Sequence, residues 1–319
     1  MNIPRYIYAR FIVTALFVAL LALHWYSWWH IVVGRDSFWI PPHILLYCAF
    51  VMSIATGLYA WWNIKGLAWW RIVLFLSLAL IAAPFDEFWR RVFDKENINN
   101  VLISWSLPHL ILLGSLFLTI FYLIPILRKD ENEQARWLFG GLALAGLVDI
   151  GFILTIPFFP TGPFQVFGFW GAGIVAFVYC IGILVANRHI SGFASSTIMA
   201  ILLTLLSIFA IEGSNAVLAL SPMPYNQVPT WLILFALLIP AIVNDLAGER
   251  FSSLLRGLVA GVLWGGILFG FSSIFFASEF KYSFQKGLQA TVSSGVGGML
   301  AAIMLIIFQT EKVIYRYSV

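Results

Sequence analysis

The residues from Pro108 to Leu127 read PHLILLGSLFLTIFYLIPIL and contain no Asp, Glu, Lys or Arg. A helix needs roughly 20 mostly apolar residues to cross the hydrocarbon core of a bilayer, and this stretch supplies them. Similar stretches recur along the chain and predict an all-α, polytopic integral membrane bundle of about ten transmembrane helices. The predicted spans are Ile7–Trp29, His43–Trp61, Trp70–Phe88, Pro108–Leu127, Leu138–Phe158, Phe164–Ala186, Phe193–Asn215, Trp231–Leu246, Leu255–Phe276 and Leu288–Phe308.

The composition excludes a pair of soluble domains. Hydrophobic residues make up 61% of the 319 residues and charged residues 10%, whereas soluble domains have about 45–50% and about 25%. The basic residues are scattered singly, so no nucleic-acid partner is expected. The expected partner is the lipid bilayer, with other membrane subunits of a complex as an open alternative. We expect one transmembrane domain over residues 1–319, in which residues 1–127 carry the candidate metal ligands and residues 128–319 provide packing.

Lysine and arginine are distributed unequally between the two sides of this bundle. Twelve of the 18 lie in the N-terminal segment, the even-numbered connections and the C-terminal segment, and six lie in the odd-numbered connections. Because cytoplasmic connections carry the excess of Lys and Arg, the count predicts that both termini are cytoplasmic. The predicted location is the inner (cytoplasmic) membrane, with the odd-numbered connections on the outer side.

A weak internal repeat accompanies the spans. Asp86, Asp149 and Glu212 are spaced 63 and 63 residues apart, each near the outer end of an odd-numbered span. A proline-containing connection and an even-numbered span follow each acid. Repeated two-helix hairpins would explain the spacing, but ten helices of similar length would also produce it.

Four of the five histidines, His24, His30, His43 and His109, map to the outer ends of the first four spans. Ionisable side chains in a membrane are costly and are candidates for function. His30 closes the first span and His43 opens the second, across the turn IVVGRDSFWIPP. Two imidazoles at one hairpin mouth can share a transition-metal ion. The alternative is that these histidines are interfacial and bond to the backbone of the turn.

The second hairpin has a similar order of residues before and after its connection, although the residue types differ in part. Asp86 and Trp89-Arg90 precede the connection, and Pro108-His109 follows it. Asp86 is the best candidate for a third metal ligand and His109 the next, although Asp86 and Arg90 are four residues apart and could simply pair with each other. His24 ranks last, because six residues of helix place it on a different face from His30.

The stretch from Trp29-His30 to Pro41-Pro42-His43 resembles the C subunit of the copper membrane monooxygenases, the particulate methane and ammonia monooxygenases. The motif of that family has an Asp before a Trp-His pair, then Arg-Asp-Ser/Thr, an aromatic residue and Pro-x-His, with histidines 13 residues apart, as they are here. The resemblance implies that His30 and His43 bind copper and that Asp36 belongs to the turn. It covers about twenty residues strongly and the second hairpin weakly.

The chain departs from that pattern at two ligand positions. Tyr26 stands where the family has its leading Asp, and Arg90 stands at the first histidine position of the second hairpin. The chain also has more spans than that subunit. We therefore expect a divergent relative with one composite copper site formed by His30, His43, Asp86, His109 and His24.

Three functions from different classes remain open at this point. One is a catalytic, copper-dependent monooxygenase subunit, and another is a non-catalytic subunit or metal-handling protein. The third is a haem-binding electron carrier that uses His24 or His43 together with His109.

Glycines are concentrated in the last two spans: Gly261, Gly265, Gly266, Gly270, Gly295, Gly297 and Gly298. Small residues allow the backbones of membrane helices to approach closely. We expect these two helices to pack tightly against each other or against a partner.

Overall fold

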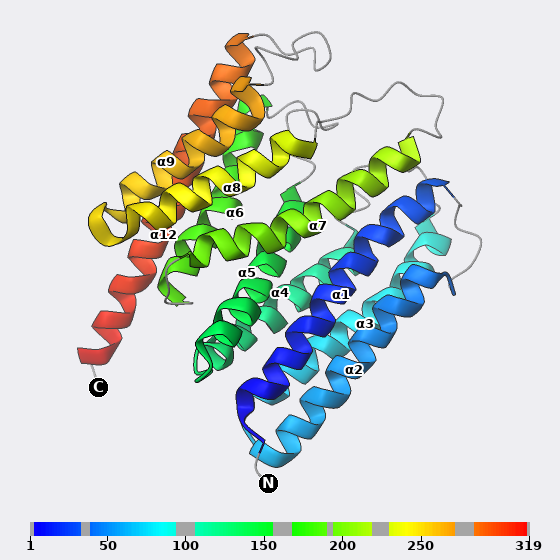
Figure 1. Ribbon diagram of the computed structural model, residues 1–319. Coiled ribbons are helices and arrows are strands. Elements are labelled where there is room, and N and C mark those ends of the chain that lie inside the picture. Colours follow the sequence, from blue (N-terminus) through cyan, green and yellow to red (C-terminus); the bar gives the residue numbers. More distant parts are fainter. Residues whose placement is uncertain are drawn as a thin grey trace. The chain divides into compact units, whose positions relative to one another are not determined.

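The computed structural model describes residues 3–32, 39–93, 106–155, 168–189, 194–218, 230–271 and 284–317. All secondary structure among these residues is helical, as the sequence predicts, and each predicted span overlaps helical residues (Figure 1). The chain divides into two compact units. Unit 1 comprises Met1–Ile150 and Leu205–Tyr225, and unit 2 comprises Gly151–Thr204 and Asn226–Val319.

Unit 1 contains α1 (Arg5–Val32), α2 (Pro41–Ile64), α3 (Leu67–Phe93), α4 (Leu107–Leu127), most of α5 (Glu133–Thr155) and the second part of α7 (Ser195–Leu218). Unit 2 contains the rest of α5 and α7, together with α6 (Gly168–His189), α8 (Thr230–Ala247), the short 3₁₀ turn η4 (Gly248–Arg250), α9 (Ser253–Gly265), the π-helical η5 (Gly266–Phe271) and α12 (Phe284–Tyr317). The whole of the predicted segment 1–127 lies in unit 1.

Seven of the described helices are long and apolar enough to cross a membrane, over Arg5–Tyr26, Pro41–Ile64, Leu67–Asp86, Leu107–Leu127, Glu133–Thr155, Ser253–Phe271 and Phe284–Ile307. Three further apolar segments are shorter, namely Gly171–Asn187, Ser195–Phe209 and Trp231–Ala247. The chain is therefore a helical, multi-pass membrane protein. Ten crossings, two-helix repeats and cytoplasmic termini stay predictions.

Proline marks the start of α2 and α4. Pro41 and Pro42 occupy the first turn of α2, and Pro108 occupies the first turn of α4. Proline is suited to these positions because its fixed φ matches a helix and its missing N–H has no intrahelical acceptor there. α2 and α3 are joined through Lys65, whose left-handed φ of 52° ends α2. This two-residue connection makes α2 and α3 an antiparallel hairpin.

The first four helices form the packed centre of unit 1. α1 contacts α2 and α4, and α3 contacts the same two helices, so each of the four helices has two of the others as neighbours. Their most deeply buried side chains include Ile12, Leu16, Leu20, Phe50, Trp69, Ile72, Leu76, Leu113, Leu116 and Ile120. The C-terminal ends of α1 and α3 and the N-terminal ends of α2 and α4 lie at one end of this cluster.

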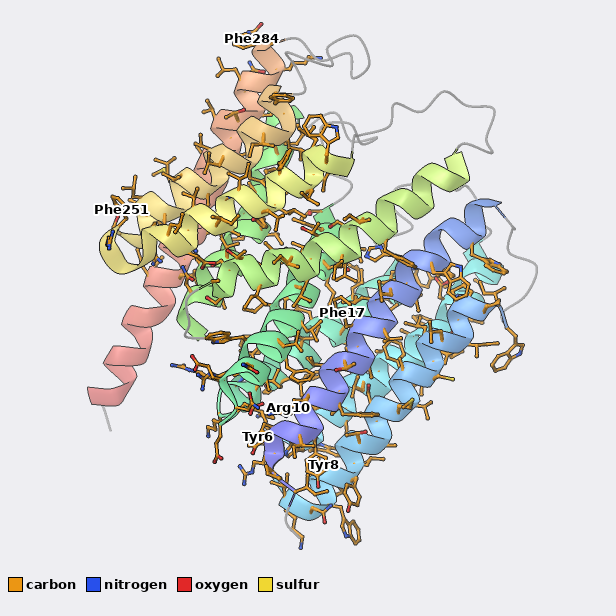
Figure 2. The ribbon with its side chains drawn as sticks, viewed as in Figure 1. Tyr6, Tyr8, Arg10, Phe17, Phe251 and Phe284 are labelled. Atoms are coloured by element: carbon orange, nitrogen blue, oxygen red, sulfur yellow. The ribbon has the colours of Figure 1, made fainter. Side chains whose placement is uncertain are left out.

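An ion pair joins the other end of α1 to the connection after α4. Nε and Nη2 of Arg10 each donate to a carboxylate oxygen of Asp130 at 2.6 Å. The Asp130 side chain is fully buried, and the Arg10 side chain is 25% exposed. The guanidinium also lies 5.1 Å from the centre of the Tyr6 ring. Both residues are labelled in Figure 2. Such a pair holds two segments together only while both charges are present.

Unit 2 is held together by close contact of glycine-bearing helices. α12 packs against α9 and α6. A Cβ atom added at Gly298 would overlap the carbonyl oxygen of Gly257, and one added at Gly297 would overlap the carbonyl oxygen of Gly173. The predicted tight packing of the last two spans on each other is confirmed, and α6 joins the same interface.

A carboxylate from α8 caps the N-terminus of α7. Asp245 accepts hydrogen bonds from the backbone N–H of Ser196 at 3.1 Å and of Thr197 at 2.7 Å. The Thr197 hydroxyl donates to the same carboxylate at 2.6 Å. The first N–H groups of a helix have no partner inside the helix, so Asp245 supplies acceptors that α7 itself lacks.

Candidate metal centre

A pocket of about 30 Å³ lies in unit 1 where α1 and α3 approach their C-terminal ends and α2 and α4 begin. Its lining residues are Leu23, Tyr26, His43, Leu46, Tyr47, Ala82, Asp86, Pro108, His109 and Leu112. All four helices contribute. Because neighbouring helices are antiparallel, the C-terminal ends of α1 and α3 lie at the same level as the N-terminal ends of α2 and α4. The pocket thus brings His43 of the first hairpin together with Asp86 and His109 of the second.

His43 is held between two phenol rings. The side chain is buried, with 7% of the residue exposed. The Tyr26 ring stacks on the imidazole with a centroid distance of 4.6 Å, and the Tyr47 ring is tilted against it at 5.7 Å. Tyr47 is one helical turn after His43, where side chains share a face. These rings fix the plane of the imidazole.

His109 is oriented through one ring nitrogen. The Ser106 hydroxyl lies 2.8 Å from Nδ1 of His109, within hydrogen-bonding distance, and a carboxylate oxygen of Asp86 lies 3.5 Å from the same atom. An adjacent carboxylate favours a proton on Nδ1, which leaves the lone pair of a neutral imidazole on Nε2. This is the arrangement in which a histidine offers Nε2 to a metal ion.

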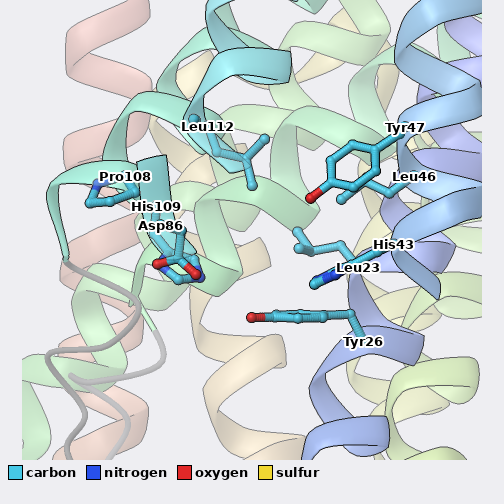
Figure 3. A pocket seen from close by; sticks show the side chains of 10 residues that line it. Leu23, Tyr26, His43, Leu46, Tyr47, Asp86, Pro108, His109 and Leu112 are labelled. Carbon is cyan, nitrogen blue, oxygen red and sulfur yellow. The ribbon is translucent and has the colours of Figure 1, made fainter. Parts of the chain in front are cut away.

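Figure 3 shows that His43 and the pair Asp86 and His109 face each other across the pocket. Asp86 and His109 lie on one side and His43 on the other, and the hydroxyl groups of Tyr26 and Tyr47 point toward the side of Asp86 and His109. The structure therefore brings Asp86 and His109 to the same pocket as His43, as the repeated hairpin frame predicts.

Three residues of the predicted hairpin pattern lie outside this description. The side chain of His30 is outside the described residues, as are residue Asp36 and the side chain of Arg90. Among the described residues, no group of three His, Cys, Asp or Glu side chains is arranged to hold a metal ion. Metal binding by His30, His43, Asp86, His109 and His24 stays a prediction.

His24 has a different partner from the other outer histidines. Its Nε2 lies 3.0 and 3.1 Å from the two carboxylate oxygens of Asp149 on α5, and both side chains are largely buried. Neither His24 nor Asp149 lines the pocket. The pair links α1 to α5 within unit 1, a contact that the sequence did not predict.

We expect loss of this pair to destabilise the protein. Asp149→Leu should lower the free energy of unfolding by about 1–3 kcal/mol, because Nε2 of His24 stays buried without its acceptor. The double variant His24→Leu/Asp149→Leu should recover most of that loss, since replacing both partners by apolar groups is nearly neutral. Thermal unfolding of the wild type, both single variants and the double variant measures the coupling. Simple additivity of the single effects would show that the two side chains do not interact.

Two tyrosines belong to the pocket although sequence reasoning did not assign them to it. Tyr26 is the residue at which the first hairpin departs from the monooxygenase motif, and Tyr47 belongs to no motif. The position of Tyr47 four residues after His43 is the available signal, because it places both rings on one face of α2.

Comparison of the chain with protein-family models, curated proteins and solved structures gives no significant match.

Proposed function

We propose that this membrane protein binds a transition-metal ion, with copper as the best match, in the pocket between the two hairpin mouths of unit 1. The observation that carries the proposal is that His43, Asp86 and His109, from three different helices, line one pocket. Imidazole suits copper, zinc, iron and nickel, and among divalent ions Cu²⁺ generally binds most tightly. The resemblance of the first hairpin to the copper membrane monooxygenase C subunits also favours copper.

The contacts divide the residues into ligands and a supporting group. His109 would bind through Nε2, because Nδ1 is the nitrogen that faces Ser106 and Asp86. His43 would bind from the opposite side of the pocket, and His30 would supply a third imidazole from the same hairpin. Asp86 then orients His109 rather than binding the ion, as carboxylates beside metal-bound histidines do. His24 is assigned to its pair with Asp149.

The size of the pocket favours an ion over a large cofactor. About 30 Å³ exceeds the roughly 10–15 Å³ that a cavity needs to hold one water molecule, whereas sites for drug-sized ligands have about 300–1,000 Å³. The haem alternative is therefore less well supported than a bound ion. A bound copper ion would supply Lewis acidity and one-electron chemistry. A monooxygenase subunit and a metal-handling protein both require such an ion and differ in whether oxygen is consumed.

Metal analysis of the purified full-length chain tests the proposal. After loading with copper and removal of free metal, the wild type should retain about one ion per chain. His43→Ala and His109→Ala should each lose most of it. Asp86→Asn should bind about 10–100-fold more weakly, the usual effect of removing a carboxylate behind a metal-bound histidine.

His189→Ala is the matched control and should retain metal, as should the double variant His24→Leu/Asp149→Leu, which leaves neither buried partner alone. His189 ends α6 and lies on the predicted cytoplasmic side. Circular dichroism checks that each variant keeps its helices. Wild-type protein that retains no more copper or zinc than the double variant His43→Ala/His109→Ala would disprove the metal site.

A further inference from the structure

The polar atoms that line the candidate metal pocket are nitrogen and oxygen. They belong to His43, Asp86 and His109 and to the phenol groups of Tyr26 and Tyr47 (Figure 3), and the other lining residues are apolar. Among the described residues, no Cys or Met side chain lines the pocket. Tetragonal sites of nitrogen and oxygen suit Cu²⁺, whereas the sulfur atoms of Cys and Met select Cu⁺. The chemistry of the lining therefore matches the divalent state of copper.

Sulfur is present on the helices that form this pocket, but it lies elsewhere. Across α1, α2, α3 and α4, the sulfur-containing residues are Cys48 and Met52, both on α2. Cys48 is exposed, and Met52 is 50% exposed. His43 and Tyr47 on the same helix line the pocket, and neither sulfur-containing residue does. α2 thus contributes an imidazole to the pocket and keeps its sulfur atoms on another face.

The charge of the pocket favours the divalent ion as well. The carboxylate of Asp86 lies 3.5 Å from Nδ1 of His109 and lines the pocket. The attraction between two charges is proportional to their product, so this carboxylate attracts Cu²⁺ more strongly than Cu⁺ at the same distance. The described lining residues include no Lys or Arg that would offset the negative charge.

We propose that the pocket selects copper in the divalent state and releases the ion when one electron reduces it. This inference rests on the metal site proposed above, and it adds the oxidation state of the ion and the way in which the ion leaves. In the step, Cu²⁺ gains one electron from an external reductant and becomes Cu⁺. The bonds that break are those between the ion and its nitrogen and oxygen ligands, and the chain itself is neither oxidised nor reduced.

Such a site is suited to metal handling. A copper ion that takes part in repeated oxidation and reduction has to stay bound in both states, and sulfur ligands would serve its reduced state. A pocket lined only by nitrogen, oxygen and carbon holds the ion firmly in one state. Reduction is then the signal that lets the ion pass to another acceptor.

Reductive release from the purified full-length chain tests this inference. The protein is loaded with copper, freed of unbound metal and treated under argon with ascorbate until the electron paramagnetic resonance signal of Cu²⁺ has disappeared. The copper that stays with the protein after desalting is then measured. We expect a loss of about tenfold or more relative to the untreated sample. Zinc-loaded protein is the matched control and should keep its ion, because Zn²⁺ has no redox chemistry.

A thioether added to the pocket should reverse the outcome. Leu112 lines the pocket and lies three residues after His109 on α4, so the two side chains share a face. Leu112→Met nearly conserves volume and supplies the sulfur that Cu⁺ prefers, so this variant should keep most of its copper after reduction. Leu110→Met is the matched control, because Leu110 is 42% exposed on the same helix and does not line the pocket. It should release copper as the wild type does.

The results separate the metal site from its selectivity. Wild-type protein that binds no copper before reduction would disprove the site itself. Wild-type protein that binds Cu²⁺ and keeps all of its copper after reduction would leave the site standing and overturn the selection of the divalent state. Equal loss of copper and zinc, or equal release from Leu112→Met and Leu110→Met, would overturn it as well. The comparison of copper with zinc in the wild type holds even if a variant fails to fold.

Discussion

Replacement of Gly298 by alanine is expected to destabilise the packing of α9 on α12. The new Cβ would overlap the carbonyl oxygen of Gly257 and approach the backbone nitrogen of Gly261 at 3.2 Å. Backbone atoms cannot rotate away as a side chain can, so the two helices must separate. Overpacking typically costs about 1–3 kcal/mol and occasionally more, and we expect the upper end of that range.

Gly114→Ala is the matched control for this change. Gly114 lies within α4, and a Cβ added there meets nothing within 4 Å. Alanine favours helix over glycine by about 1 kcal/mol, so the control should leave the protein unchanged or slightly stabilised. Thermal unfolding midpoints in the same detergent compare the two variants. A Gly298→Ala midpoint equal to that of Gly114→Ala would show that the close approach is not required.

Removal of the Arg10 guanidinium is expected to destabilise unit 1 by about 3–5 kcal/mol, the usual effect of leaving a buried charge without its partner. In Arg10→Met the apolar stem of the side chain remains, but the buried carboxylate of Asp130 loses both of its 2.6 Å hydrogen bonds. Among the described residues, the backbone N–H of Asn132, at 3.0 Å, is the donor that remains.

The double variant Arg10→Met/Asp130→Asn should recover part of this loss, because it also removes the buried charge. Arg128→Met is the control, since Arg128 is exposed in the same connection as Asp130 and should change the unfolding midpoint little. Equal effects of Arg10→Met and Arg128→Met would mean that the ion pair does not stabilise the fold.

The helices of this protein were predictable because hydropathy and structure are tightly coupled in lipid. Every backbone polar group in the hydrocarbon core must be satisfied within the chain, so a long apolar stretch can hardly be anything but a helix. The approach of Asp86 and His109 to His43 follows from the same reasoning. When antiparallel helices have similar lengths, the open ends of successive hairpins lie at one level of the bundle. Elements that follow one another in the sequence are also usually neighbours in space.

The contacts between distant helices could not be predicted in this way. His24 and Asp149 are 125 residues apart, and their meeting depends on how α1 packs against α5. The 63-residue spacing marked Asp149 as an outer acid but did not identify its partner. The α8 residue Asp245 was overlooked for another reason. A single acid near a helix end looks like an ordinary interfacial residue until the helix that it contacts is known.

The cap that Asp245 provides for α7 has a consequence for the order in which the protein is made. The first N–H groups of α7 are synthesised 48 or 49 residues before the carboxylate that accepts their hydrogen bonds. While the ribosome translates the intervening segment, the start of α7 must rely on water or lipid headgroups. It becomes fully bonded within the chain only when α8 arrives beside it. The N-terminus of α7 is therefore completed by a residue made after α7 itself, and a chain lacking Asp245 would leave these N–H groups without that acceptor.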